Sequence, residues 1–436
     1  MSEQRFVTGS REQAFLLPPD MREWLPPDHL VWAVCEAVER LDFSPFEAAY
    51  REDGQGRPAY DPRLIATLLL YAYAVGERSS RALERRCRED VAFRVAACGL
   101  QPDHVTIARF RRRHAEALIG LFGGVLALCA EAGLVRVGLV AIDGTGIRAN
   151  ANKDRVCDED PLREQARRLL AEAEAEDARE DELNADEQAA VRGLLPAAFA
   201  SEQERHVRLD EAAARLAEQP QPEDALAGEG PQRKPQTARA RGRALASARR
   251  GKRNRTDPES RILRTRSGFI QGYNAQVAVG ESHVVLACAV SQDNGDNRLL
   301  KPMVRRAEET LEAAGAGAKP RLYLADAGYW SGAAVEELEA EGRRLLVKPN
   351  GRPRTRGLPA GGPVGKMQRR LARAPNKRRY RRRQALVEPV IAHLKHLRRL
   401  DRLLLRGLSG AEVEWTLACT AHNLTRLART QAAATA

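Results

Sequence analysis

The sequence predicts a mixed α/β domain that is preceded by an all-α N-terminal domain and interrupted by an insertion that is first helical and then flexible. Amphipathic helical segments fill residues 1–125, and apolar runs of strand length begin at residue 137 and resume at residue 272. A stretch of strongly biased composition separates the two groups of strands. With 436 residues, of which 43% are hydrophobic, the chain can bury the cores of two or three domains.

Residues 1–125 are read as a series of short helices. Pro-rich punctuation precedes an expected helix over residues 29–41. Asp61 followed by Pro62 marks the start of another helix, because Asp is a favoured N-cap and Pro fits the first helical position. Asp90 is expected to cap a further short helix.

The last helix of this domain carries a concentrated positive charge. Thr106 is expected to cap it, and the turn ahead of it gives the order helix, turn, helix that is typical of one class of DNA-binding motif. A helical bundle with one basic face is the alternative that this pattern leaves open. We expect DNA contacts from the four arginines of this helix, Arg109, Arg111, Arg112 and Arg113.

The α/β domain begins after residue 125. Residues 126–154 lead through a helix into a buried strand over residues 137–142, and the turn-forming sequence Asp-Gly-Thr-Gly at residues 143–146 is expected to interrupt that strand. After the insertion, strands at residues 272–279 and 283–290 are expected to form an antiparallel hairpin. The remaining expected elements are a helix at 297–314, a strand at 321–325, a helix at 332–341, a strand at 344–348, a loop at 349–383, and helices at 384–405 and 411–429.

Residues 155–255 differ in composition from both flanks. Their first part is acidic, Ala-rich and helically periodic, and their second part is rich in Pro, Gln, Ala and Arg. Because no run here resembles a strand, we interpret the segment as a helical hairpin or coiled coil followed by a flexible basic linker. The predicted domains are therefore residues 1–125, the insertion at 155–255, and a core formed by residues 126–154 and 256–436.

The charge balance favours a nucleic-acid partner. The formal net charge is +12, from 71 Lys and Arg against 59 Asp and Glu. Arginine suits bidentate phosphate contacts, whereas a merely solvated Arg-rich surface is the alternative reading.

Cysteine usage and hydropathy point to a cytoplasmic protein. Seven scattered cysteines include no CxxC pair, which indicates reduced thiols rather than a disulfide framework or a structural zinc site. No secretory signal and no apolar run long enough to cross a membrane is expected.

Three carboxylates stand on recognisable elements. Asp143 and Asp326 each end an apolar run, and Glu388 lies near the start of the expected helix at residues 384–405. Taken singly, the two aspartates fit turns and the glutamate fits a first-turn acid. Gathered at one point they would repel each other unless divalent cations neutralised them, and in a basic protein a hard-metal site points to chemistry on nucleic-acid phosphates. Asp296, just before an expected helix, is interpreted instead as its N-cap.

The order of elements and the sequence around the acids carry a family resemblance. Three antiparallel strands followed by helix and strand is the order of the RNase H-like fold, which brings the first and fourth strands together. Ala-Ile-Asp-Gly-Thr-Gly at residues 141–146 and Ala-Asp-Ala-Gly-Tyr-Trp-Ser at residues 325–331 surround the two aspartates. With the segment at residues 380–395, these motifs resemble those of bacterial DDE-type insertion-sequence transposases.

The resemblance assigns roles to individual residues. The Tyr-Arg-Glu-Lys signature of the family corresponds to Tyr380, Arg383, Glu388 and Lys395, with four residues between Arg and Glu where the commonest form has three. It implies that Asp143, Asp326 and Glu388 are catalytic and hold two Mg²⁺ (or Mn²⁺) ions, without a small-molecule cofactor. Tyr380, Arg383 and Lys395 would contact DNA, and Lys395, seven residues after Glu388, is expected on nearly the same helical face.

The implied function is DNA transposition. A transposase would bind the terminal inverted repeats of an insertion sequence, cut the double-stranded DNA and join the ends to a target, as a homodimer or larger assembly on paired ends. Two alternatives remain open from the sequence: a metal-dependent nuclease that does not join strands, and a catalytically silent DNA-binding repressor.

Overall fold

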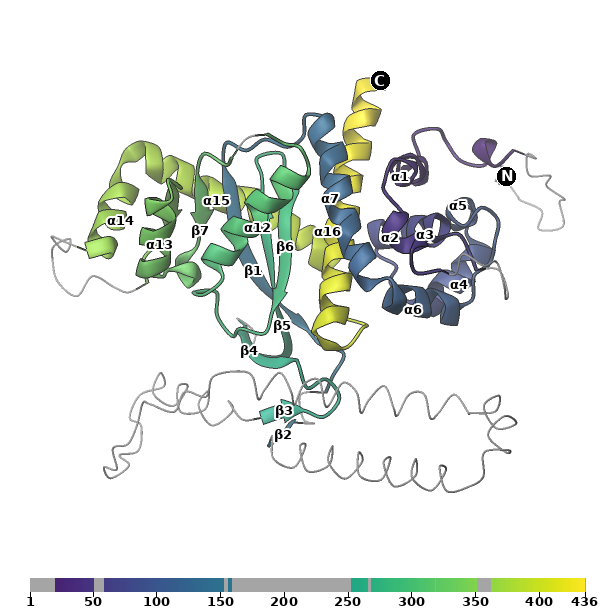
Figure 1. The fold of residues 1–436 in the computed structure, drawn as a ribbon, viewed down its shortest axis with the longest axis horizontal. Coiled ribbons are helices and arrows are strands. Elements are labelled where there is room, and N and C mark those ends of the chain that lie inside the picture. Colours follow the sequence, from purple (N-terminus) through teal and green to yellow (C-terminus); the bar gives the residue numbers. More distant parts are fainter. Residues whose placement is uncertain are drawn as a thin grey trace, which may run out of the picture.

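A six-stranded mixed sheet forms the centre of the molecule, and a helical N-terminal domain lies to one side of it (Figure 1). The computed structural model describes residues 20–50, 59–152, 156–158, 252–265, 268–317, 319–350 and 362–435. The expected α/β core with a preceding helical region is therefore confirmed at this level.

The N-terminal domain consists of short helices, as expected from its caps. Asp61 accepts a hydrogen bond from Arg63 N at 2.7 Å, and Asp90 accepts one from Ala92 N at 2.9 Å. The expected cap at Thr106 is wrong, because Asp103 accepts from the Thr106 amide at 2.8 Å and the helix begins at His104. The elements are 3-10 helix η1 (Met21–Glu23), α1 (Leu30–Glu39), α2 (Ser44–Glu47), α3 (Pro62–Ala74), α4 (Ser80–Glu89), α5 (Val91–Ala96), α6 (His104–Arg113) and α7 (Ala115–Glu131).

The sheet has the strand order β4-β5-β1-β7-β8, with β6 also paired to β5. β1 is antiparallel to β5 and parallel to β7, which is in turn parallel to β8. The strands are β1 (Val140–Arg148), β4 (Arg261–Thr265), β5 (Gly268–Val279), β6 (Val285–Ser291), β7 (Tyr323–Ala325) and β8 (Leu345–Val347). The expected hairpin is confirmed as β5 and β6, while β4 was not expected from the sequence.

The first strand is not interrupted at its Asp-Gly-Thr-Gly sequence, contrary to the sequence prediction. β1 pairs with β5 without a break from Ala141 to Arg148. The glycines serve close packing within the strand: a Cβ on Gly144 would lie 2.2 Å from Gln276 Nε2, and one on Gly146 would lie 3.2 Å from Ile270 Cδ1. Glycine in a strand marks such close approaches as well as turns.

The segment predicted as a loop at residues 349–383 contains helix in its described part, and α15 begins ten residues before the predicted start of the helix that bears Glu388. Pro375 sits in the first turn of α15, where proline is tolerated. Helices of the core are α12 (Leu300–Ala313), α13 (Gly332–Ala340), α14 (Gly362–Ala372), α15 (Ala374–Ala392) and α16 (Gly407–Thr435), with a 3-10 turn η2 (Ala327–Tyr329) and a π-helical turn η3 (His393–Leu397).

The described ends of the insertion pair with each other. β2 (Val156–Asp158) and β3 (Lys252–Asn254) form a separate two-stranded antiparallel sheet, so the prediction that residues 155–255 contain no strand is wrong. The predicted helical hairpin and basic linker lie outside the described residues. In Figure 1 this small sheet lies next to the β4 end of the main sheet.

The C-terminal helix joins the N-terminal domain to the core. α16 packs on α7 and α3 on one side and on β6 on the other, and α7 and α16 lie side by side in Figure 1. Trp415, fully buried, donates from Nε1 to the Gln276 carbonyl at 3.0 Å. In the part of the chain described here, no single helix combines the length and apolarity of a membrane span, although α6 and α7, bent by 77°, reach them as a pair.

Candidate active site

Asp143 and Asp326 lie next to each other on adjacent parallel strands. The last paired residues of the β1–β7 ladder are Ile142 and Ala325, so the two aspartates are the next residues on each strand. Neighbouring strands are about 4.8 Å apart, and in-register residues of parallel strands point to the same face. Asp143 lies within β1 rather than at its end, but it is the first residue after Ile142 that has no paired residue on β7.

Asp143 forms an ion pair with α15. Arg383 Nη1 donates to Asp143 Oδ2 at 2.6 Å, and both side chains are mostly buried, with 12% and 19% of their area exposed. Burial raises the pKa of Asp143, Arg383 opposes that shift, and the nearby negative charge of Asp326 adds to it. Asp143 Oδ1 also accepts from the Gly144 amide at 2.9 Å. Arg383 thus compensates part of the cost of burying this carboxylate.

Asp326 begins the short turn that follows β7. Its Oδ1 accepts from Gly328 N at 2.7 Å, which makes it the N-cap of η2. This local bond fixes the carboxylate beside the end of β1. Within the described residues Asp326 forms no ion pair, although its negative charge lies close enough to Arg383 to help raise the pKa of that guanidinium.

Asp296 lies in this region too, and its interpretation as an N-cap is wrong. The N-cap of α12 is Leu299, whereas Asp296 Oδ1 accepts from Asn274 Nδ2 at 2.8 Å and from Gln276 Nε2 at 2.9 Å. A Cβ on Gly328 would lie 3.1 Å from Asp296 Oδ2 and 3.0 Å from Asp326 Oδ1. Both oxygens therefore lie within about 6 Å of each other, on either side of the space that Gly328 leaves open.

Tyr329 completes the polar network around these acids. Its hydroxyl donates to Gln276 Oε1, and its side chain is fully buried. Burial, together with the charges of Asp296, Asp143 and Asp326, raises its pKa well above the usual value. The signal for this network in the sequence is the pair of amides at alternate positions of β5, Asn274 and Gln276, which the sequence analysis did not use.

Glu388 is on the helix that contacts the sheet, but it points to solvent. It lies in the second half of α15, not near its start, and it is exposed, while Leu386, Val387 and Val390 form the buried face. It forms no ion pair within the described residues. In the same part of the chain, no three His, Cys, Asp or Glu side chains are already arranged to hold a metal ion. The structure therefore brings together Asp143 and Asp326, and leaves Glu388 outside their immediate contact.

Comparison with known families decides what these domains are. Residues 19–113 match the model of a family described as "Transposase domain (DUF772)", and residues 246–424 match that of a family described as "Transposase DDE domain". The chain carries the domains of an insertion-sequence DDE transposase. A transposase DDE domain implies an enzyme that acts on DNA, a general use of divalent metal ions, and an RNase H-like core. No curated protein and no solved structure matches the chain.

The family match divides the acids of the transposase. The matched DDE segment contains Asp296, Asp326 and Glu388, but Asp143 stands ahead of the insertion and outside it. The pairing of β1 with β5 and β7 nevertheless seats Asp143 inside the sheet formed by the matched segment.

Lys395 contacts β1 directly. Its Nζ donates to Thr145 Oγ1 at 2.9 Å and to the Gly146 carbonyl at 3.0 Å, along the edge of β1 that β7 leaves unpaired. Burial lowers its pKa. The predicted common face with Glu388 is wrong, because Lys395 reaches the sheet while Glu388 is exposed, and the π-helical turn η3 changes the helical spacing between them.

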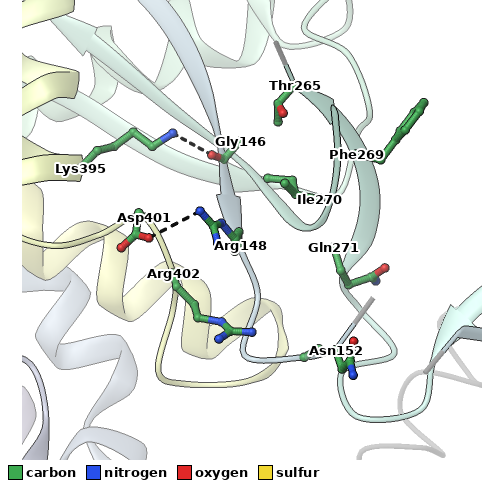
Figure 2. Close-up of a pocket in the computed structure, with 11 residues that line it drawn as sticks. Gly146, Arg148, Asn152, Thr265, Phe269, Ile270, Gln271, Lys395, Asp401 and Arg402 are labelled. Carbon is green, nitrogen blue, oxygen red and sulfur yellow. Dashed lines mark hydrogen bonds and ion pairs between the residues drawn. The ribbon is translucent and has the colours of Figure 1, made fainter. Parts of the chain in front are cut away.

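A pocket of about 630 Å³ begins beside Lys395 and opens along β1, β4 and β5 (Figure 2). Arg148 and Arg402 line it with Lys395, and Asp401 faces Arg148 at 3.9 Å. Phe269, with 50% of its area exposed, stands on the opposite wall. The pocket therefore combines excess positive charge with an accessible aromatic ring.

The basic helix of the N-terminal domain divides into exposed and buried arginines. Arg109, Arg112 and Arg113 are exposed, and the Arg113 guanidinium lies 4.5 Å from the ring centre of Tyr50. Arg111 is only 2% exposed and lies against the Tyr73 ring, so its expected contact with DNA is not compatible with its position. Of the predicted DNA contacts, Tyr380 and Arg383 lie on α15 facing the aspartates, and burial raises the pKa of Tyr380.

Proposed function

We propose that this transposase binds the terminal inverted repeats of an insertion sequence, cleaves them with two Mg²⁺ or Mn²⁺ ions held by Asp143, Asp326 and Glu388, and joins the ends to target DNA. The observation that carries the proposal is the register of β1 and β7, which seats two carboxylates side by side where the ladder ends. Two-metal sites of this kind use a few carboxylates on rigid elements, because Mg²⁺ prefers oxygen ligands and retains several waters.

The residues at the site fit divalent cations. Asp143, Asp326 and Asp296 bring three negative charges to the end of the β1–β7 ladder, and Arg383 is the cation paired with them among the described residues. Glu388 is on a helix that packs on β1, β5 and β7, between one residue that binds Asp143 and another that binds Thr145. A change of side-chain rotamer and a small shift of α15 would be the route by which it joins the aspartates.

The chain's own residues then have distinct tasks. Bound divalent ions would activate the attacking water or 3′-hydroxyl and stabilise the leaving oxygen. Asp143 and Asp326 orient the reacting phosphate on a rigid sheet, where small misplacements are costly. Arg383, released from Asp143, would turn to a DNA phosphate, and Tyr380 would support it from one turn earlier on α15.

The DNA path follows the basic surface on both sides of this site. Lys395, Arg148 and Arg402 would hold the strand that leaves the acids, and Phe269 offers a ring on which an unpaired base can stack. Arg109, Arg112 and Arg113 would contact the duplex of the terminal repeat. Two ends must be held together, so we infer a homodimer or larger assembly, working on DNA in the cytoplasm.

The decisive experiment supplies purified protein with Mg²⁺, an end-containing oligonucleotide and a target plasmid. Cleaved and joined products are expected from the wild-type chain, and Asp143→Asn, Asp326→Asn and Glu388→Gln should each lose them while binding the end in a gel shift. Glu312→Gln, which removes an exposed acid of α12, is the matched control. Cleavage that is never followed by joining would reassign the protein as a nuclease, and full activity of any one of the three variants would remove that residue from the site.

A further inference from the structure

We infer that Asp296 is a positioning residue for Asp326, acting through Gln276 and Tyr329. The inference rests on the proposed function, since it assigns to Asp326 a metal-binding task. Asp296 belongs to the connection between β6 and α12, Gln276 to β5, and Tyr329 to the turn that Asp326 begins. One buried network thus ties that turn to the middle of the sheet.

Hydrogen bonds join all four side chains of the network. Gln276 Nε2 donates to Asp296 Oδ1 at 2.9 Å and to Asn274 Oδ1 at 2.9 Å, while its Oε1 accepts from the Tyr329 hydroxyl. Asn274 Nδ2 donates to the same Asp296 oxygen at 2.8 Å. Gln276 and Tyr329 are fully buried and Asn274 is 8% exposed. Buried polar side chains destabilise a fold unless they are paired, and a hydrogen-bonded network of buried side chains favours one geometry.

The geometry places this network against the turn that carries Asp326. Alternation along β1 sends Asp143 to the α15 side, whereas the space above Gly144 is occupied from the other side by Gln276 and Asp296. At Gly328, the missing side chain leaves room for oxygens of both Asp326 and Asp296 at about 3 Å. Asp296 therefore reaches the Asp326 turn from the face of β1 opposite to Arg383.

The second carboxylate oxygen of Asp296, which accepts no hydrogen bond within the network, is the one through which Asp296 would act on Asp326. Oδ1 accepts from both amides, and Oδ2 lies beside Gly328, where Asp326 Oδ1 also lies. Neither Asp296 nor Asp326 forms an ion pair in the part of the chain that is described. A fixed negative charge at this distance makes a cation on Asp326 more favourable, and the amide network keeps both carboxylates from turning apart.

The test measures metal binding by the full chain in the absence of DNA, using the electron paramagnetic resonance signal of free Mn²⁺. Asp296→Ala removes both charge and network, and should weaken Mn²⁺ binding about tenfold or more, as outer partners of metal ligands typically do. Tyr329→Phe keeps every charge and removes one bond, and should weaken it in the same direction by less. Asp293→Asn, three residues earlier, removes a charge whose carboxylate accepts from Ser291, and should leave Mn²⁺ binding unchanged.

A second readout separates positioning from folding. In cleavage assays on a terminal repeat, Asp296→Ala should raise the Mn²⁺ concentration for half-maximal rate while the affinity for DNA stays constant. Asp296→Asn, which keeps the acceptor oxygen, should restore part of the loss. Lower melting temperatures with unchanged Mn²⁺ affinity in both Asp296→Ala and Tyr329→Phe would overturn the inference and leave the proposed function intact. Absence of Mn²⁺ binding by the wild-type chain, with or without DNA, would instead remove the proposed function.

Discussion

At the scale of single residues, the ion pair between Arg383 and Asp143 is the contact that governs the site. The two groups meet at 2.6 Å in a largely buried setting, where a charge-assisted hydrogen bond is stronger than at the surface. Under the proposed function, Arg383 would compete with metal ions for Asp143. DNA phosphates would then draw Arg383 away and free that carboxylate for a cation.

Arg383→Gln tests this coupling. Without the guanidinium, Asp143 is free for a cation, so the protein alone should bind Mn²⁺ about tenfold more tightly, the equivalent of losing one charged hydrogen bond of about 1.5 kcal/mol. Its affinity for end DNA should fall, and the slope of log affinity against log salt should decrease by about 0.9, because one phosphate contact is lost. Titration of Mn²⁺ and of salt on the same preparation gives both numbers, with Arg382→Gln on the exposed face of α15 as control. Unchanged Mn²⁺ affinity would show that the ion pair does not guard Asp143.

Phe269 is the exposed aromatic residue of the basic pocket, and the proposed DNA path gives it unpaired bases to stack on. Stacking of a base on an aromatic ring contributes about 1–3 kcal/mol, so Phe269→Ala should weaken binding to an end with unpaired flanking nucleotides by that amount. Binding to the fully paired end should change little, since no base is free to stack. Val75→Ala, which truncates another exposed apolar side chain, is the control. Equal loss on both substrates would assign Phe269 a general role in folding or packing.

At the scale of elements, local signals predicted the helices and the hairpin well. Asp61 and Asp90 each accept a hydrogen bond from a backbone amide in the first turn of a helix. First-turn amides have no partner inside the helix, so a short acceptor just before a helical pattern predicts a cap. The β5–β6 hairpin followed from two apolar runs separated by a short polar connection. The adjacency of Asp143 and Asp326 was an inference from strand order, and the observed register accounts for it physically.

The errors arise where tertiary packing overrides a local signal. Gly144 and Gly146 read as a turn, yet both stay in β1 because neighbouring side chains occupy the space above them. The dense charge at residues 374–383 led to the prediction of a loop there, although these residues form the first half of α15. A helix at the surface needs only one apolar face to pack on the core. Asp296 was predicted to be an N-cap because it precedes a helix in the sequence. Its side chain instead accepts hydrogen bonds from amides of β5, about 20 residues earlier in the chain, and no local sequence pattern reveals that contact.

His422 gives α16 a measurable pH dependence. Burial lowers its pKa to about 3, and its Nε2 donates to the His283 carbonyl at 2.9 Å. Because the folded-state pKa lies below the unfolded value of about 6.5, the unfolded chain takes up the proton first as pH falls. The imidazole should therefore reduce the free energy of unfolding between pH 6.5 and 3, by about 2 kcal/mol at pH 5 relative to pH 7.

His422→Gln keeps a donor for that carbonyl and cannot become charged. Urea unfolding of this variant and of the wild-type chain at pH 7 and pH 5 isolates the contribution of the imidazole from all other titrations. The difference between the two pH values should be smaller in the variant by about 2 kcal/mol. Identical pH dependence in both proteins would mean that His422 is accessible to protons in the folded state.

At the scale of the whole molecule, one buried ion pair fastens the N-terminal domain to the catalytic core. Arg78, 8% exposed, binds Glu414 of α16, which is fully buried, at 3.0 Å. Arg78 also donates to the carbonyls of Arg399 and Arg402, and Glu414 accepts from Leu404 N at 3.0 Å. The same contact thus holds the segment that follows Lys395 and lines the basic pocket.

Breaking this pair from one side should be costly. Glu414→Gln leaves the Arg78 charge buried with a weaker partner, and Arg78→Met leaves Glu414 uncompensated, so each should lower the free energy of unfolding by about 3–5 kcal/mol. The double variant Arg78→Met with Glu414→Leu removes both charges and should recover much of that loss, because apolar residues replace buried ion pairs without large penalty. Denaturant unfolding of the four proteins completes the cycle, and Arg305→Met, which removes an exposed partner of Glu341, is the control expected to change stability by less than about 1 kcal/mol. A double variant as unstable as the sum of the single ones would show that the junction depends on the backbone hydrogen bonds of these side chains rather than on their mutual charge.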